Sequence, residues 1–180
     1  MDIFINKIYN PKLKRQEVFF DKDWSSIIDM TSYGHDIESA WLIEWGCKLL
    51  DDINLQNKID EICSDLADNT YEKAYRENSV RNECVEGVED EKRIWWVQAE
   101  SVLGFLNMAQ KKPEQAKYLK AAEDILTFIK EKLIDKRPGS EWLSEVLPDG
   151  SNTGNKMPIV DEWKCPYHNG RMCLEILTRE

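Results

Sequence analysis

Two histidines, two glutamates and a group of tryptophans are the residues of this chain whose types and spacing could support chemistry on a small substrate. His35 and Glu38 are three residues apart at the start of a predicted helix, so they share a face, and Trp41 follows three residues later towards the same side. An imidazole can take up and release a proton near neutral pH because its ordinary pKa is about 6.5. This first group is typical of an acid/base site.

Two further groups carry the same residue types. Trp96 and Glu100 are four residues apart and share a helix face, while Trp163 precedes His168 in a segment with proline at position 166 that leads into the last predicted helix. Both histidines of the chain therefore lie where a loop meets a helix, beside tryptophans. Indole faces stack on the apolar faces of sugars and carboxylates bind sugar hydroxyls, so these groups favour a carbohydrate site.

Each group also has a purely structural interpretation. A single histidine in a helical protein is more often a packing residue than a catalyst, and Glu38 and Glu100 fit ordinary solvated helix charges equally well. At least one of Trp95 and Trp96 must face the core, because adjacent residues cannot share one helix face. The location of both histidines beside tryptophan and polar residues favours the functional interpretation.

No metal and no cofactor is predicted. Cys165, His168 and Cys173 lack the paired cysteines and the fourth ligand of a zinc site. The sequence also contains no glycine-rich phosphate loop, no GxSxG elbow and no HExxH helix. These absences exclude the common nucleotide-dependent, serine-hydrolase and zinc-protease mechanisms, and they leave histidine as the acid or base.

A series of helical hairpins is predicted to position these side chains. Apolar residues recur at helical spacing, as at Leu119, Ala122, Leu126 and Ile129. The segments 17–32 and 76–90 are predicted to be irregular, and 138–162 to be a long connection rich in Gly, Asn, Asp and Pro. The fold is therefore expected to be all-α, in one domain over residues 1–180. The predicted helices cover a helix end at 2–9 and then about 35–51, 54–75, 91–111, 114–134 and 166–176.

Charge and composition exclude several classes of partner. The 180 residues include 24 basic and 34 acidic side chains, a net charge of −10, which disfavours nucleic acid and anionic membranes. Charges interrupt every apolar run before the ~18 residues that a membrane span needs, and the first residues lack the pattern of a signal peptide. Five scattered cysteines, an odd number, indicate free thiols in a reducing compartment. We therefore expect a cytoplasmic protein.

Four segments of the chain resemble a known family. SYGHDIESAWL at 32–42, WWVQAESVLGFLN at 95–107, EWLSEVLPDG at 141–150 and WKCPYHNGRMCLEI at 163–176 are similar to the C-terminal half of the cellobiose 2-epimerases, within the N-acylglucosamine 2-epimerase group. The resemblance extends over nearly the whole chain in the same order. It implies half of an (α/α)6 barrel, which agrees with the predicted series of hairpins.

The resemblance also implies an activity. Members of this family interconvert the glucose and mannose configurations at C2 of a reducing mono- or disaccharide through a cis-enediolate, with two histidines sharing the acid/base work. These histidines match His35 and His168. The positions that match substrate-binding residues are Glu38, Trp41, Trp96, Glu100 and Trp163.

The sequence departs from the family pattern in two respects. The other half of the barrel, with a site arginine and further histidine and aromatic residues, has no counterpart here, and the segment 70–90 lacks the glycine-rich turn expected before Asn82 and Glu83. An N-terminal half-barrel or a second copy is therefore the expected partner, and the isolated chain is expected to be a poor enzyme. Two alternatives remain: a non-catalytic carbohydrate-binding module, and a toroidal glycoside hydrolase that uses two carboxylates.

Overall fold

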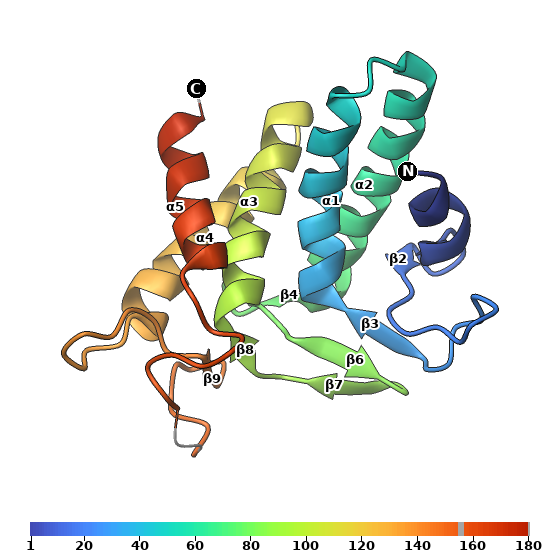
Figure 1. The fold of residues 1–180 in the computed structure, drawn as a ribbon. Coiled ribbons are helices and arrows are strands. Elements are labelled where there is room, and N and C mark those ends of the chain that lie inside the picture. Colours follow the sequence, from blue (N-terminus) through green and yellow to red (C-terminus); the bar gives the residue numbers. More distant parts are fainter. Residues whose placement is uncertain (155–156, 180) are drawn as a thin grey trace.

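The computed structural model describes residues 1–154 and 157–179, and five helices dominate it (Figure 1). The predicted helices are confirmed with small shifts of their ends. The helix predicted over 114–134 ends at Phe128 and continues as a π-helical turn, and a similar turn lies near the N-terminus. In chain order these elements are η1 (Phe4–Ile8), α1 (Tyr33–Lys48), α2 (Ile53–Ala74), α3 (Trp95–Lys111), α4 (Ala116–Phe128), η2 (Ile129–Leu133) and α5 (Tyr167–Thr178).

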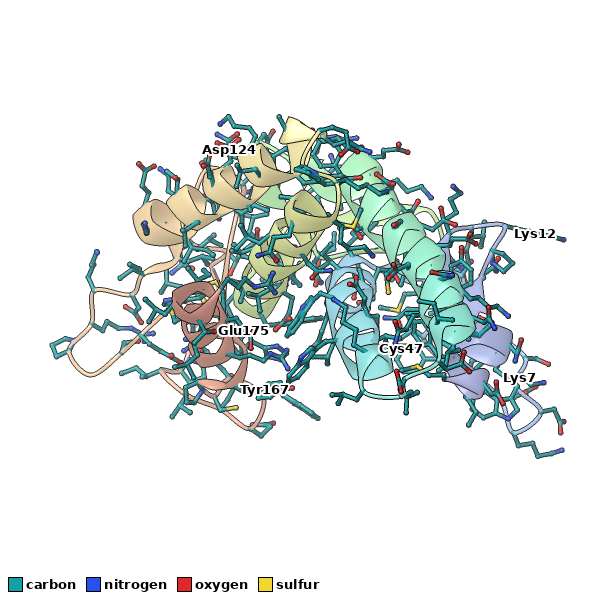
Figure 2. The ribbon with its side chains drawn as sticks, turned by 90° about the horizontal axis from the view of Figure 1, so that it is seen from above. Lys7, Lys12, Cys47, Asp124, Tyr167 and Glu175 are labelled. Atoms are coloured by element: carbon teal, nitrogen blue, oxygen red, sulfur yellow. The ribbon has the colours of Figure 1, made fainter. Side chains whose placement is uncertain are left out.

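The helices form two layers. α1 packs against α2 and α3 against α4, while α3 also lies between α1 and α5. Seen from above, α1, α3 and α5 follow one another along the inner side of an arc, and α2 and α4 cover its outer side (Figure 2). The core lies between the layers and includes Ile37, Leu66, Leu103, Phe105 and Ile125, all fully buried. Each of the inner helices therefore contributes apolar side chains to this core.

Two glycines bring the inner helices close together. A Cβ atom at Gly104 of α3 would lie 2.5 Å from Ile37 Cγ1 of α1. A Cβ atom at Gly34, in the first turn of α1, would lie 2.4 Å from the Trp96 ring. Such contacts are far inside van der Waals distance, so only glycine permits α1 and α3 to approach this closely. The approach matters because both helices carry predicted site residues.

The prediction that residues 76–90 form a loop is wrong. Two short antiparallel hairpins occupy the segment, β4 (Tyr75–Arg76) with β5 (Ser79–Val80) and β6 (Glu83–Val85) with β7 (Val88–Asp90). Their turns, Glu77-Asn78 and Glu86-Gly87, have positive φ at both central positions, which is the geometry of a tight two-residue hairpin. Strands of two or three residues are too short for an alternating apolar pattern, so they leave little trace in the sequence.

The remaining strands tie the loops to the ends of the helices. Three of them precede α1, namely β1 (Tyr9–Asn10), β2 (Arg15–Gln16) and β3 (Met30–Ser32). β3 pairs with β6 to give a three-stranded sheet in the order β3-β6-β7 below the inner helices (Figure 1). β8 (Arg93–Ile94) pairs with β9 (Glu145–Val146), which fastens the long connection before α5 to the start of α3.

No helix in the described part of the chain has an apolar stretch long enough to cross a bilayer.

Candidate active site

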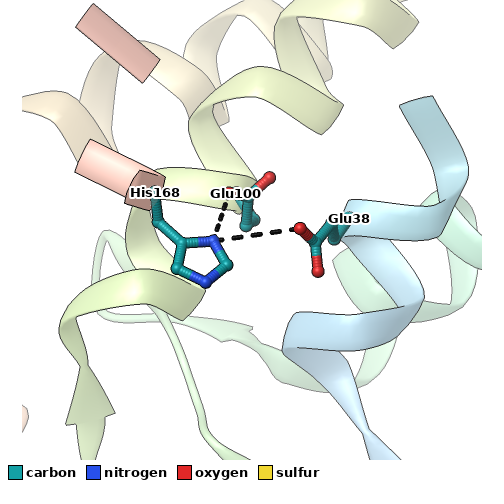
Figure 3. A group of neighbouring side chains, drawn as sticks. All are labelled: Glu38, Glu100 and His168. Atoms are coloured by element: carbon teal, nitrogen blue, oxygen red, sulfur yellow. Dashed lines mark hydrogen bonds and ion pairs between the residues drawn. The ribbon is translucent and has the colours of Figure 1, made fainter. Parts of the chain in front are cut away.

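Three inner helices each contribute one side chain to a polar cluster, with Glu38 from α1, Glu100 from α3 and His168 from α5 (Figure 3). His168 Nδ1 lies 2.7 Å from Glu100 Oε1 and 3.8 Å from Glu38 Oε1. The Glu100 side chain is completely buried, whereas Glu38 and His168 keep 17% and 19% of their side-chain surface exposed. The cluster is therefore buried on the side of Glu100 and partly exposed on the side of Glu38 and His168.

The contact with Glu100 determines where His168 carries its proton. A carboxylate oxygen accepts hydrogen bonds, so Nδ1 of His168 must donate to Glu100 Oε1 at this distance. In the neutral ring, Nε2 then holds the lone pair. Nε2 points away from both carboxylates (Figure 3), and no residue in the described part of the chain hydrogen-bonds to it. His168 is thus an imidazole oriented by a carboxylate with its basic nitrogen free.

Arg171 completes the cluster, and it was not among the site residues predicted from the sequence. Its Nη2 donates to Glu38 Oε1 at 2.6 Å and to Glu100 Oε1 at 2.7 Å. Burial alone would lower the pKa of the guanidinium, but the hydrogen bonds and charges of the two carboxylates outweigh it and raise the pKa. Arg171 is three residues after His168, one turn along the same face of α5. The three-residue spacing between His168 and Arg171 was the signal in the sequence that could have identified Arg171 as a site residue.

Aromatic rings hold the guanidinium in place. The Cζ atom of Arg171 lies 5.0 Å from the ring centroid of Trp41 and 4.4 Å from that of Tyr167, whose hydroxyl accepts from Nη1. Trp41 is itself buried, and its Nε1 donates to Glu100 Oε2 at 3.0 Å. Both oxygens of Glu100 are therefore engaged, one by Trp41 and the other by His168 and Arg171.

The cluster also has the spacing of a potential metal site. One ligand atom each from Glu38, Glu100 and His168 lies within 4.8 Å of the others, a spacing that a cation could bridge. Arg171 Nη2 already donates to the same Oε1 atom of each carboxylate. The guanidinium therefore supplies the positive charge that a metal ion would bring, and this donor set fits a cation poorly.

His35 is linked to His168 through Trp96. The Trp96 ring lies 4.9 Å from the His35 ring and 5.3 Å from the His168 ring, centroid to centroid. The pKa of His35 is lowered from its ordinary value, mainly because the surrounding protein desolvates the ring. Glu38 opposes this shift and His168 adds to it. The lowered pKa favours the neutral form of the imidazole, and the residue as a whole is exposed.

The structure brings most of the predicted site residues together, with one exception. Trp163 is 83% exposed on the connection before α5, and no ring contact or side-chain hydrogen bond to another described residue links it to the cluster. The residues that meet around the cluster are His35, Glu38, Trp41, Trp96, Glu100 and His168. The contribution of each to substrate binding stays a prediction.

The long connection before α5 fixes the position of His168. Glu141 accepts from Asn169, the residue next to His168, and also from the buried Lys164 at 3.4 Å. Lys164 Nζ donates in addition to the backbone carbonyl of Ile159 at 2.7 Å. α5 then begins at Tyr167, directly after Pro166, which preorganises the first turn. The hydrogen bonds of Glu141 and Lys164 thus hold the first turn of α5 against the long connection.

Comparison with known proteins gives a consistent family assignment. The model of the N-acylglucosamine 2-epimerase family matches residues 1–168. A cellobiose 2-epimerase of Eubacterium cellulosolvens is 50% identical over 177 residues, and one of Dictyoglomus turgidum is 46% identical over the same length. Each match covers 98% of this chain but only 43% and 45% of the relative, so the chain spans less than half the length of these proteins.

Solved structures show the same relation. A sugar epimerase from a ruminal bacterium superposes with a TM-score of 0.94 at 40% identity, covering 99% of this chain and 45% of that protein. The cellobiose 2-epimerase of Bacillus thermoamylovorans gives a TM-score of 0.91, also at 40% identity and with the same coverage. These structures are (α/α)6 barrels, and the two-layered arc described above corresponds to about half of one.

Proposed function

The chain belongs to the N-acylglucosamine 2-epimerase family, and from this premise we propose that it supplies one half of the active site of a sugar 2-epimerase. The proposed substrate is a reducing disaccharide of the cellobiose type, or a reducing monosaccharide, whose configuration at C2 is inverted. The chain spans less than half the length of these relatives, so a complete barrel also needs a second half that this sequence does not contain.

The observation that carries the proposal is the pair of imidazoles on either side of Trp96. In an open-chain sugar the C2 hydrogen is acidic because it is next to the C1 carbonyl. A neutral imidazole can remove it to give a cis-enediolate, and delivery of a proton to the opposite face inverts C2. His35 and His168 share this acid/base work, while Glu38, Trp96 and Arg171 line the surface on which the sugar would lie.

The alternative of a glycoside hydrolase has weaker support. Such an enzyme needs two carboxyl groups that both reach the glycosidic bond. Glu100 has no exposed surface and both of its oxygens accept hydrogen bonds from other side chains. It is placed to orient His168 rather than to act on a substrate.

The test is proton exchange at C2 in a reconstituted assembly. This assembly is defined as the present chain mixed with the part of the Eubacterium cellulosolvens relative that the match leaves out. In D2O with cellobiose, we expect deuterium at C2 and formation of the glucosyl-mannose epimer, measured by NMR and mass spectrometry. Sugar binding without exchange would instead identify a binding module, and release of glucose would identify a hydrolase. Either result would overturn the proposal.

The isolated chain is expected to associate and to turn over slowly. A groove of about 370 Å³ between α3, α4 and α5 is lined mainly by apolar side chains, including Leu106, Leu119 and Ile176, and Leu174 and Leu177 of α5 are exposed nearby. Covering about 200 Å² of apolar surface contributes about 5 kcal/mol, at about 25 cal/mol per Å². The proposed occupant of this groove and of the exposed leucines beside it is the complementary half-barrel.

Light scattering combined with the exchange assay checks this expectation. The chain alone should form dimers or larger species with little exchange, and adding the complementary half should give a defined complex with much faster exchange. Leu177→Ser should weaken the complex, whereas Thr127→Ser, at an exposed position of the outer helix α4, serves as the matched control. A stable monomer with full activity would show that the second half is not needed.

A further inference from the structure

Ser32 occupies an unusual position at the start of α1. It is the N-cap residue of the helix, yet its side chain makes no hydrogen bond to the backbone of the first turn. A serine at this position normally accepts a hydrogen bond from the backbone N–H two or three residues later. Here its Oγ lies 2.7 Å from Nδ1 of His35, the third residue of the helix, and Ser32 is 3% exposed. The hydroxyl is thus directed at an imidazole.

The surroundings decide which group donates in this hydrogen bond. Among the residues that the structure describes, Ser32 Oγ has no partner other than His35. The unpaired backbone groups at a helix N-terminus are N–H donors, so they cannot accept the hydroxyl hydrogen. If Nδ1 were the donor, the buried hydroxyl hydrogen would have no acceptor, which is costly. The hydroxyl therefore donates to Nδ1, and the neutral His35 ring carries its hydrogen on Nε2.

His168 has the opposite arrangement, because its Nδ1 donates to Glu100 and its Nε2 holds a lone pair. The two rings both contact Trp96 but offer different groups to a ligand. We propose that Ser32 is a positioning residue that locks His35 in the Nε2–H form, so that at rest His168 is the base and His35 the hydrogen-bond donor. This inference deepens the proposed function and rests on it.

The two tautomers determine which histidine removes the proton from C2 in the first half of the reaction. The C2–H bond breaks and its proton passes to Nε2 of His168, which becomes an imidazolium. The electron pair of that bond forms the C1–C2 double bond, and the carbonyl pair moves onto O1. In this half of the reaction the Nε2–H of His35 hydrogen-bonds to O1 as negative charge develops there, and the proton stays on Nε2. His35 in this form has no lone pair at Nε2 with which to compete as the base.

NMR of the full chain labelled with ¹⁵N-histidine tests the proposal without an activity assay. Only two histidines are present, so His35→Asn assigns both sets of signals. We expect a protonated Nε2 and a hydrogen-bonded, unprotonated Nδ1 for His35, and the reverse pattern for His168. In Ser32→Ala the His35 Nδ1 signal should shift to that of a free nitrogen, and Ser32→Thr, which keeps the hydroxyl, should restore it.

Exchange in the reconstituted assembly provides the second measurement. Ser32→Ala should lower the rate of C2 exchange about tenfold with little change in KM, because it disturbs O1 stabilisation rather than sugar binding. Ser39→Ala, on the same helix and hydrogen-bonded to Gln16, is the control. A proton on Nδ1 of His35, or an unchanged His35 spectrum in Ser32→Ala, overturns this inference alone. Absence of exchange with the expected NMR pattern overturns the proposed function and, with it, the roles assigned here.

Discussion

Replacing His168 by asparagine is expected to lower C2 exchange in the reconstituted assembly by about 100- to 10,000-fold, the range for loss of a positioned acid or base. The asparagine amide can still donate to Glu100 from roughly the place of Nδ1, so the cluster keeps its hydrogen bond. What disappears is the free Nε2 lone pair, the only group at this position that can take up a proton. Binding of cellobiose, measured by calorimetry, should change much less than exchange.

The fold of this variant should be retained, because 19% of the His168 side chain is exposed and the ring contributes no core packing comparable with a buried aliphatic residue. Circular dichroism and urea unfolding will verify this. Cys173→Ser, at an exposed position further along α5, is the matched control and should leave exchange unchanged. Exchange that stays within a few-fold of the unsubstituted chain would show that His168 is not the base.

Glu100→Gln is expected to be the most destabilising conservative change in the cluster, by about 3 kcal/mol in the free energy of unfolding, near the lower end for loss of a buried charge partner. The Glu100 side chain is fully buried and accepts from His168, Arg171 and Trp41. A glutamine amide places an N–H group against one of these donors and removes the charge. Arg171 keeps only Glu38 as its anionic partner.

Urea unfolding of the whole chain measures this effect. Glu38→Gln, at a side chain that is 17% exposed, should cost less than Glu100→Gln, because water partly solvates Glu38. Glu123→Gln, an exposed glutamate on α4, should stay within about 0.5 kcal/mol. Exchange should also fall in Glu100→Gln, because the carboxylate no longer holds the proton on Nδ1 of His168. Equal stability of Glu100→Gln and Glu123→Gln would contradict this role for Glu100.

The sequence by itself determined the helices and the residues that they carry. Helical periodicity is local, so the spacing of apolar residues located all five helices, and the spacings His35–Glu38 and Trp96–Glu100 correctly placed each pair on one face. The adjacent Trp95 and Trp96 were correctly expected to include a core residue, and Trp95 is 4% exposed. The family resemblance, and with it the half-barrel fold, also followed from the sequence motifs.

Only the tertiary structure decided how these faces meet. Arg171 contacts Glu38 and Glu100, which lie 133 and 71 residues away along the chain, and no local pattern encodes a contact between three helices. The same holds for the burial of Glu100 and for the exposure of Trp163, which the motif alone could not distinguish from a pocket residue. Secondary structure follows from neighbours within a few residues, whereas burial and ion pairing depend on which helices pack together and how closely.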